Sequence, residues 1–401
     1  MFVETLAAIG CGIMFGTLTG LTPGIHINLV ALIVLSLAAS LGVQPILLGV
    51  FIISMAITHT YLDALPGIYL GAPDSDHALS VLPGHRLLLR GKGHVAVLST
   101  LVGSLFCLMM AISLYPLFIF LMRLIHERIQ AYIGFILIAI MCYMIFKEKS
   151  WRKRLLSLTL FFMAGSLGLI VLNMHSLSQP LFPLLSGLFG ISLLLLSLAN
   201  DSSIPKQQKI CDAELEPKVI CKAVSASTGM GFIAAFLPGF GSAQAAIIAQ
   251  QLVGKLGDRG FLVLTGGINT ANMLISIATA YTLHKARNGA IIVVNKLLGE
   301  ITLSYVLIFL ASALVVAGIA TVLTLKMSRL FIKVMEKVNY RKLVISIIMF
   351  IVFLTFGFDG ILGLYVLMVA TSVGMLTGLL GIGKNHLMGC LLLPVILYFT
   401  L

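Results

Sequence analysis

A chain of 401 residues in which 59% are hydrophobic and only 10% are charged is too apolar for a soluble protein. Soluble proteins average about 45–50% and about 25% for these classes. Apolar runs long enough to cross a bilayer recur along the chain, so the composition excludes soluble, disordered and secreted disulfide-rich proteins and predicts an all-α polytopic membrane protein. The net charge of +12 fits the basic cytoplasmic loops of membrane proteins, and no nucleic-acid-binding motif is present.

The apolar segments form two series. The first begins with residues 5–41, interrupted at Pro23-Gly24, and continues with spans near 45–62, 94–122, 129–146, 154–172 and 180–199. The second begins with residues 222–254, interrupted at Pro238-Gly239, and continues with spans near 260–283, 289–325, 343–356, 360–380 and 386–401. Residues 200–221 are polar and predict a cytoplasmic linker between an N-terminal repeat, residues 1–199, and a C-terminal repeat, residues 222–401.

The two series align as an internal repeat. GTLTGLTPGIHINLVALI, from residue 16, lies over GFIAAFLPGFGSAQAAII, from residue 231, so that both Pro-Gly pairs coincide. Each interrupted segment is too long for one crossing and contributes an even number, as a pair of crossings or a re-entrant hairpin. An odd number of further spans follows in each half, which predicts two inverted-topology repeats, each with a Pro-Gly-broken helix hairpin.

Charge predicts the sidedness. The most basic connections, residues 147–154 and 326–342, belong in the cytoplasm. This places residues 175–179, Asp359 and both termini outside a cell membrane that the chain crosses many times. Residues 328–340 are periodic enough for an interfacial helix, with a basic loop as the alternative.

Two helices broken inside the bilayer point positive N-terminal ends into it, and such ends bind anions. Gly241 permits close approach of a ligand to backbone N–H groups, while His26 and Asn28 supply hydrogen-bond donors after the first break. The alternative for the two breaks is that they are proline kinks in packed helices. The alternative for His26 and Asn28 is that they cap the helix that begins after the first break.

The span after each break also carries polar groups. Ser54, Thr58 and Tyr61 share one helix face, and Asn269 and Asn272 share another. Such groups usually face a bundle interior or a cavity, although interhelical hydrogen bonds are the alternative. The predicted substrate-binding residues are Pro23, Gly24, His26, Asn28, Ser54, Thr58, Pro238, Gly239, Gly241, Ser242, Gln244, Asn269 and Asn272.

His59 and Asp63 end an apolar span and are the candidates for coupling transport to H⁺ or Na⁺. The polar stretch that follows, residues 62–94, contains acids and histidines that suggest a metal site, but Asp74 and His77 fit an ordinary helix N-terminus after Pro73 better. We therefore expect no metal and no cofactor.

Five segments resemble one family: GTLTGLTPGIHINL, GAPDSDHALSVLPGHRLLLRGKG, FPLLSGLFGISLLLLS, FLPGFGSAQAAI with INTANM, and NHLMGCLLLPVILY. They resemble the large membrane subunit of tripartite tricarboxylate transporters, the TctA family, and are most similar to its shorter archaeal-type members. Bacterial members usually have Asn-Thr-Pro-Gly at residues 71–74, where this chain has Gly-Ala-Pro-Asp. The resemblance implies secondary transport of an anion, with a substrate-binding protein or a small membrane subunit as partner.

The leading hypothesis is an ion-coupled secondary transporter of an organic anion, a carboxylate, bound between the broken-helix N-termini at the repeat interface. Its other expected contacts are membrane lipids, with no nucleic acid. A polyprenyl-phosphate lipid translocase on the same scaffold is the alternative, since the lipid phosphate is also an anion. An intramembrane enzyme using His59, Asp63, Asp74 and His77 is a third hypothesis, but no catalytic motif supports it.

Overall fold

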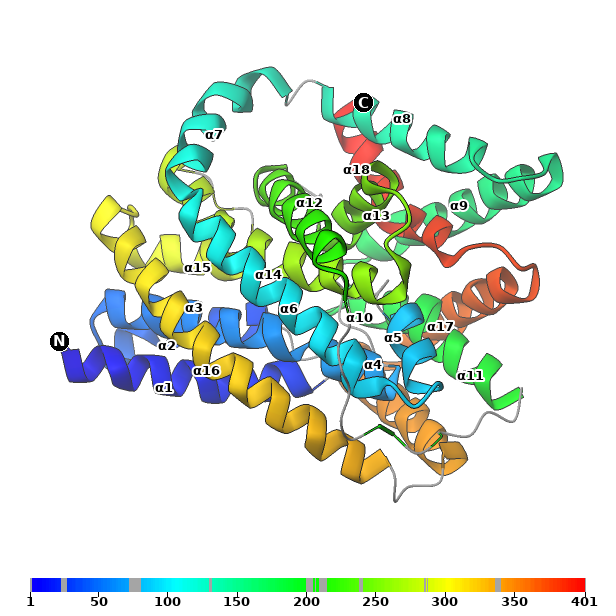
Figure 1. Ribbon diagram of the computed structural model, residues 1–401, viewed down its shortest axis with the longest axis horizontal. Helices are drawn as coiled ribbons and strands as arrows, with labels where there is room; N and C mark the ends of the chain where they lie inside the picture. Colours follow the sequence, from blue (N-terminus) through cyan, green and yellow to red (C-terminus); the bar gives the residue numbers. More distant parts are fainter. Residues whose placement is uncertain are drawn as a thin grey trace.

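The computed structural model describes residues 2–22, 27–71, 81–129, 132–199, 205, 207–208, 215–237, 241–284, 286, 288–335 and 340–400. These ranges are helical and contain no strand, as the composition predicts (Figure 1). The first half contains α1 (Phe2–Leu21), α2 (Ile27–Leu41), α3 (Pro45–Leu62), α4 (Ala64–Leu70), α5 (Val81–Leu88), α6 (Gly93–Ser113), α7 (Tyr115–Ile129), α8 (Ile133–Phe146), α9 (Trp151–Leu172), α10 (Leu181–Leu185), the π-helix η2 (Ser186–Ile191) and α11 (Ser192–Ala199). The second half contains α12 (Pro217–Phe236), α13 (Ser242–Val253), α14 (Gly257–Leu283), α15 (Gly289–Leu298), α16 (Leu303–Met335), α17 (Tyr340–Leu379), the 3₁₀ helix η3 (Lys384–Met388) and α18 (Gly389–Thr400).

In the described ranges, 7 helical segments are long and apolar enough to cross a membrane. Burial separates them into central and peripheral helices. The apolar window of α14 is 94% buried and that of α3–α4 is 78% buried, whereas the windows of α1, α9, α16 and α17 are 22–39% buried. The chain is therefore a multi-pass membrane protein whose peripheral helices present apolar side chains to lipid, while α3 and α14 form its centre.

The packing of α1 and α12 is compatible with the repeat predicted from the sequence. The ends of α1 and α12 coincide when Pro23 is aligned with Pro238. Each of these helices packs on the next long helix at an aligned glycine. A Cβ on Gly16 would lie 2.5 Å from the Met55 carbonyl oxygen of α3, and one on Gly231 would lie 2.6 Å from Ala271 Cβ of α14. The fold is compatible with inverted repeats, and their two-fold relation in the membrane plane stays a prediction.

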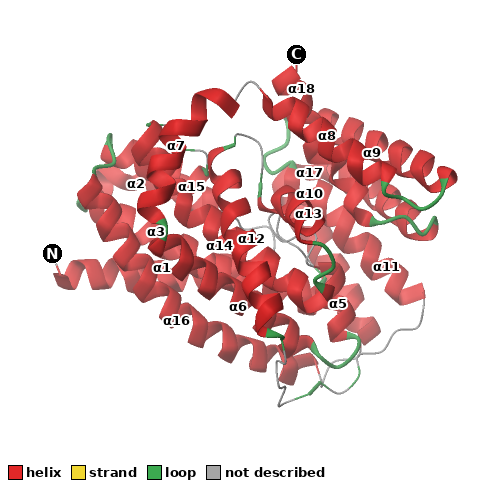
Figure 2. Cartoon of the chain, turned by 45° about the horizontal axis from the view of Figure 1, so that its top comes forward, coloured by secondary structure: helices red, strands yellow, loops and turns green. Residues whose placement is uncertain are grey.

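The halves interlock. Helix α16 of the second half packs along α3, and α6 of the first half packs along α14. In Figures 1 and 2, α1, α2 and α3 lie at the end of the molecule marked N, whereas α8 and α9 lie at the opposite end, with α6, α12 and α14 between them. The described part of the linker also docks on the first half: Gln207 is buried, donates to the Leu88 carbonyl and accepts from Gly93 N. The bounds of the two repeats and the linker, residues 1–199, 200–221 and 222–401, stay a prediction from the sequence.

Two predicted spans are wrong in detail. The span predicted over 289–325 is divided into α15 and α16, because Gly299 adopts a left-handed φ of 73° that ends α15. The span predicted over 94–122 is likewise divided at Leu114, between α6 and α7. The interfacial helix considered at 328–340 is, as far as Met335, the end of α16. The predicted break near residue 360 is confirmed, since α17 is kinked at Gly360.

Candidate functional site

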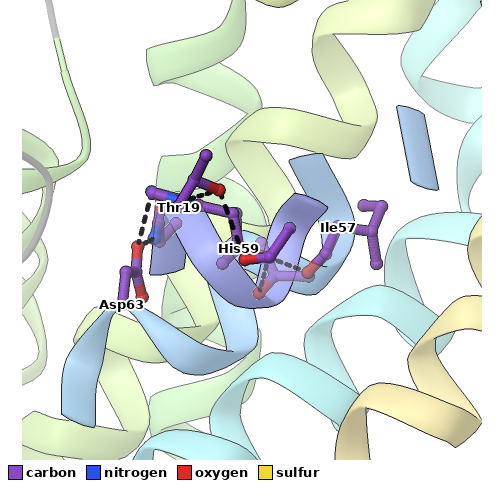
Figure 3. A network of polar contacts seen from close by, with 8 residues as sticks. Thr19, Ile57, His59 and Asp63 are labelled. Atoms are coloured by element: carbon purple, nitrogen blue, oxygen red, sulfur yellow. Dashed lines mark hydrogen bonds and ion pairs between the residues drawn. The ribbon is translucent and has the colours of Figure 1, made fainter. Parts of the chain in front are cut away.

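A buried polar cluster joins the C-terminal end of α3 to α1 and α14. His59 Nδ1 lies 3.1 Å from Thr19 Oγ1 of α1, and His59 Nε2 lies 3.8 Å from Asp63 Oδ2. Asn269 Nδ2 of α14 donates to the same Asp63 oxygen at 2.8 Å. Figure 3 shows Thr19, His59 and Asp63 lying close together at the end of α3. We call Thr19, His59, Asp63 and Asn269 the carboxylate cluster.

The carboxylate cluster lies inside the protein. Asp63 and His59 are each 3% exposed and Asn269 is 4% exposed. One turn before Asp63, Thr60 accepts a hydrogen bond from Thr270 of α14 at 3.3 Å, so α3 and α14 meet through two polar contacts. A buried carboxylate beside an imidazole and an amide can take up a proton or ligate a small cation, because either one neutralises the negative charge that is costly to bury.

A further polar contact of α14 lies at the N-terminus of α13. Asn272 Nδ2 donates to Ser242 Oγ at 3.2 Å. The N–H of Gly241, the residue that precedes α13, donates to Gln244 Oε1 at 3.0 Å. Gly241 has a φ of −90°, which any residue can adopt. The Gly241 N–H thus has a side-chain oxygen as its acceptor, at the end of α13 where a helix N-terminus can bind anions.

Asn269 and Asn272 connect these two places. They are three residues apart on α14 and therefore on neighbouring positions of one helix face, with Cβ atoms roughly 5–6 Å apart. Asn269 holds the carboxylate of Asp63, and Asn272 holds the hydroxyl of Ser242. The two contacts therefore lie about one helical turn apart on α14.

Other predicted substrate-binding residues have packing contacts. Cβ atoms on Gly12 and Gly16 of α1 would lie 2.6 Å from the Cβ atoms of Ser54 and Thr58, so these two side chains lie in the α1–α3 interface. Thr58 Oγ1 donates to the Ser54 carbonyl of its own helix. Asn28, in the first turn of α2, lies against Gly289 at the start of α15. A role for Ser54, Thr58 and Asn28 in substrate binding stays a prediction.

Several residues named in the sequence analysis lie outside the described residues: Pro23, Gly24, His26, Asp74, His77, Pro238 and Gly239. Within the described ranges, no three His, Cys, Asp or Glu side chains come together as a metal site. His85, another histidine of the polar stretch, is buried in α5.

The structure adds Thr19 to the site, which the sequence did not single out. Thr19 is 3% exposed and meets His59 from α1. A threonine in an apolar helix gives a weak signal, because its hydroxyl can bond to its own helix, as Thr19 also does to the Gly16 carbonyl. The feature of the sequence that could have indicated Thr19 as a site residue is its position shortly before the Pro23-Gly24 break.

Comparison with known proteins agrees with this architecture. The family described as tripartite tricarboxylate transporter TctA matches residues 6–389. The chain belongs to the TctA family. It is also 29% identical over 400 residues to the uncharacterized protein MJ1079 of Methanocaldococcus jannaschii, a match that covers 97% of each chain. No solved structure matches the chain.

Membership of the TctA family makes the chain a component of a transport system, in which the expected partners are a substrate-binding protein and a small membrane subunit. In a TctA protein, buried polar groups at the centre of a membrane bundle are candidates for the path of substrate and coupling ion. The Asn269–Asp63 and Asn272–Ser242 contacts of α14 are two places where the described residues offer such groups.

Proposed function

We propose that this TctA-family protein is an ion-coupled secondary transporter of an organic anion, a carboxylate, which binds at the N-termini of the broken helices between the repeats. The observation that carries the proposal is the pair of contacts on α14: Asn269 on the buried acid Asp63 and, one turn away, Asn272 on Ser242 at the start of α13. This arrangement places a group able to bind the coupling ion next to a group able to bind an anion.

The anion binds at the start of α13. The N-terminus of a helix carries roughly half a positive charge, so two such ends facing one cavity offset one carboxylate. Gln244 Oε1 accepts from Gly241 N, and a substrate carboxylate oxygen takes over this acceptor position when it binds. Ser242 and Asn272 then provide the side-chain donors, as Asn272 Nδ2 already lies within hydrogen-bonding distance of Ser242 Oγ.

The coupling ion binds at Asp63. When Asp63 gains a proton or a cation, Asn269 no longer faces an isolated negative charge, and its hydrogen bond to the carboxylate weakens. This contact links α3 of the first half to α14 of the second, so occupation of Asp63 changes how the two halves are held together. Substrate on Asn272 and ion on Asp63 then favour the same arrangement of α14, which is the requirement for coupled transport.

The test is binding and counterflow exchange of a panel of radiolabelled carboxylates by purified, reconstituted protein. Gly241→Val keeps an allowed backbone conformation but covers the N–H groups of α13, so binding should fall by far more than the tenfold expected for one lost hydrogen bond of roughly 1–1.5 kcal/mol. Asn272→Ala removes one donor to an ionised group and should weaken binding by about 1.5–3 kcal/mol. Unchanged binding in folded Gly241→Val would refute the site, and competition by polyprenyl phosphate alone would favour the lipid alternative.

A further inference from the structure

A cavity of about 550 Å³ lies apart from the carboxylate cluster, and its lining is strongly basic. Segments far apart in the sequence enclose it: α5, the residue after α8, the C-terminal part of α13, the start of α14, and η3. Figures 1 and 2 show α5 close to α13. The charged residues of the lining are Arg86, Lys147, Lys255, Lys384 and Asp258. We call this cavity the lysine vestibule.

The single carboxylate of the lining is already neutralised. Asp258 accepts from Arg86 Nη1 at 2.8 Å, and Arg90 Nη1 lies 3.8 Å from its other oxygen. Lys147 donates to the neutral amide of Gln251 at 2.6 Å. Among the described residues, no carboxylate pairs with Lys147, Lys255 or Lys384, so the vestibule carries excess positive charge.

Lys384 is the strongest sign that the vestibule accepts an anion. It is only 6% exposed, and its Nζ donates to Ser192 Oγ at 2.7 Å. An ammonium group has three donors, and a buried ammonium without a counter-ion is unfavourable. Burial lowers the pKa of Lys384 to about 8, since the protein around it disfavours the charged form. A bound anion supplies the missing negative charge and stabilises the charged form of Lys384.

The vestibule shares helices α13 and α14 with the proposed substrate site. The first residue of α13, Ser242, belongs to that site, and Gln250 of the same helix lines the vestibule. At about 1.5 Å per residue, the two positions are roughly 12 Å apart along the helix. Helix α14 makes the same connection, because Asp258 and Phe261 line the vestibule and Asn272 contacts Ser242.

We propose that the lysine vestibule is a second binding site, which holds a carboxylate substrate with two or more negative charges on its way to or from the α13 N-terminus. The proposal deepens the proposed function and rests on it for the statement that the bound anion is the substrate. Three lysines without carboxylate partners select a multivalent anion over a monovalent one, because each added charge on the ligand is attracted by all of them.

The test is isothermal titration of purified protein with citrate, inorganic phosphate and acetate at fixed ionic strength and pH 7. Citrate should bind saturably, and acetate should not. Lys255→Gln combined with Lys384→Gln should weaken citrate binding at least tenfold, and Lys255→Gln combined with Lys147→Gln serves if the buried substitution impairs folding. Lys149→Gln is the matched control, since Lys149 is an exposed lysine close in sequence to Lys147 that does not line the vestibule.

Lysine methylation, read by peptide mass spectrometry, locates the bound anion. Citrate should protect Lys147 and Lys255 from methylation and leave Lys149 unprotected. Equal citrate affinity in the vestibule and control variants, or equal protection of all three lysines, would overturn the proposal. In nanodiscs, loss of citrate binding on adding phosphatidylglycerol would also overturn it, because a lipid phosphate would then be the occupant. If citrate binds in the vestibule but the protein transports no carboxylate, the vestibule site stands and the proposed function is refuted. If the protein transports carboxylates but citrate does not bind in the vestibule, the proposed function stands and the vestibule site is refuted.

Discussion

Replacing Asp63 with asparagine removes the negative charge of the carboxylate cluster and leaves the size of the side chain nearly unchanged. The substituted amide has nearly the same volume, and its carbonyl oxygen can still accept from Asn269 Nδ2, which now donates to Asp63 at 2.8 Å. Exchanging a charged acceptor for a neutral one should cost about 1 kcal/mol of stability, so the protein should fold. What it loses is the only carboxylate of the cluster.

The size of the expected effect follows from that single carboxylate. One proton carried per substrate couples a gradient of one pH unit to about 1.4 kcal/mol, which is a tenfold accumulation. In proteoliposomes with such a gradient and the membrane potential held at zero, the wild-type protein should accumulate its substrate about tenfold, whatever the charge of the substrate. Asp63→Asn should only equilibrate it, while counterflow exchange continues.

The control is Asp359→Asn. Asp359 is the other buried acid among the described residues, and it lies outside the cluster, where it accepts from the backbone N–H groups of Ser178 and Gln179. This variant should keep the tenfold accumulation. Proton-driven accumulation that survives both in Asp63→Asn and in His59→Gln would refute coupling through the cluster.

Three further predictions concern stability, each measured by unfolding in detergent. Gly16→Ala places a Cβ 2.5 Å from the backbone of α3 and should destabilise the protein by about 1–3 kcal/mol, whereas Gly10→Ala, with no atom within 4 Å, should not; equal effects would contradict the α1–α3 packing. Asp359→Asn should lower stability by roughly 1.5–3 kcal/mol, because two backbone donors lose a charged acceptor, and an unchanged midpoint would contradict this. The folded-state pKa of Lys384 is about 8. Since the unfolded chain binds this proton up to about pH 10.5, stability should rise by a few kcal/mol from pH 8 to 10.5, and Lys384→Met should abolish the rise. An equal rise in that variant would assign it to other groups.

Local signals predicted the broken helices and the buried positions. The structure confirms that α1 ends at Leu21 and α12 at Phe236, shortly before the aligned Pro-Gly pairs. Polar residues in apolar spans predicted burial correctly for Asp63 and Asn269. Proline interrupts a helix wherever it occurs in its interior, and a polar side chain is costly to expose to lipid wherever it occurs in a membrane span. The sequence alone therefore reveals both features.

Features that depend on packing were not predictable. The break at Gly299 lies within a stretch that the sequence predicts as one span, since glycine is common in membrane helices and does not by itself mark the end of one. Asp63 and Asn269 were candidates for separate roles, and their contact depends on how α3 and α14 cross. The lysine vestibule is assembled from segments that are distant in the sequence, and basic residues at such positions read as ordinary loop charge.

The most direct test of the transporter account is uptake of a panel of carboxylates into proteoliposomes under separate H⁺ and Na⁺ gradients. We predict that at least one carboxylate accumulates under one of the two gradients and that the matching ionophore abolishes the accumulation. The same preparation carrying Asp63→Asn should lose it. If properly folded wild-type protein moves no carboxylate under either gradient, the central claim is contradicted.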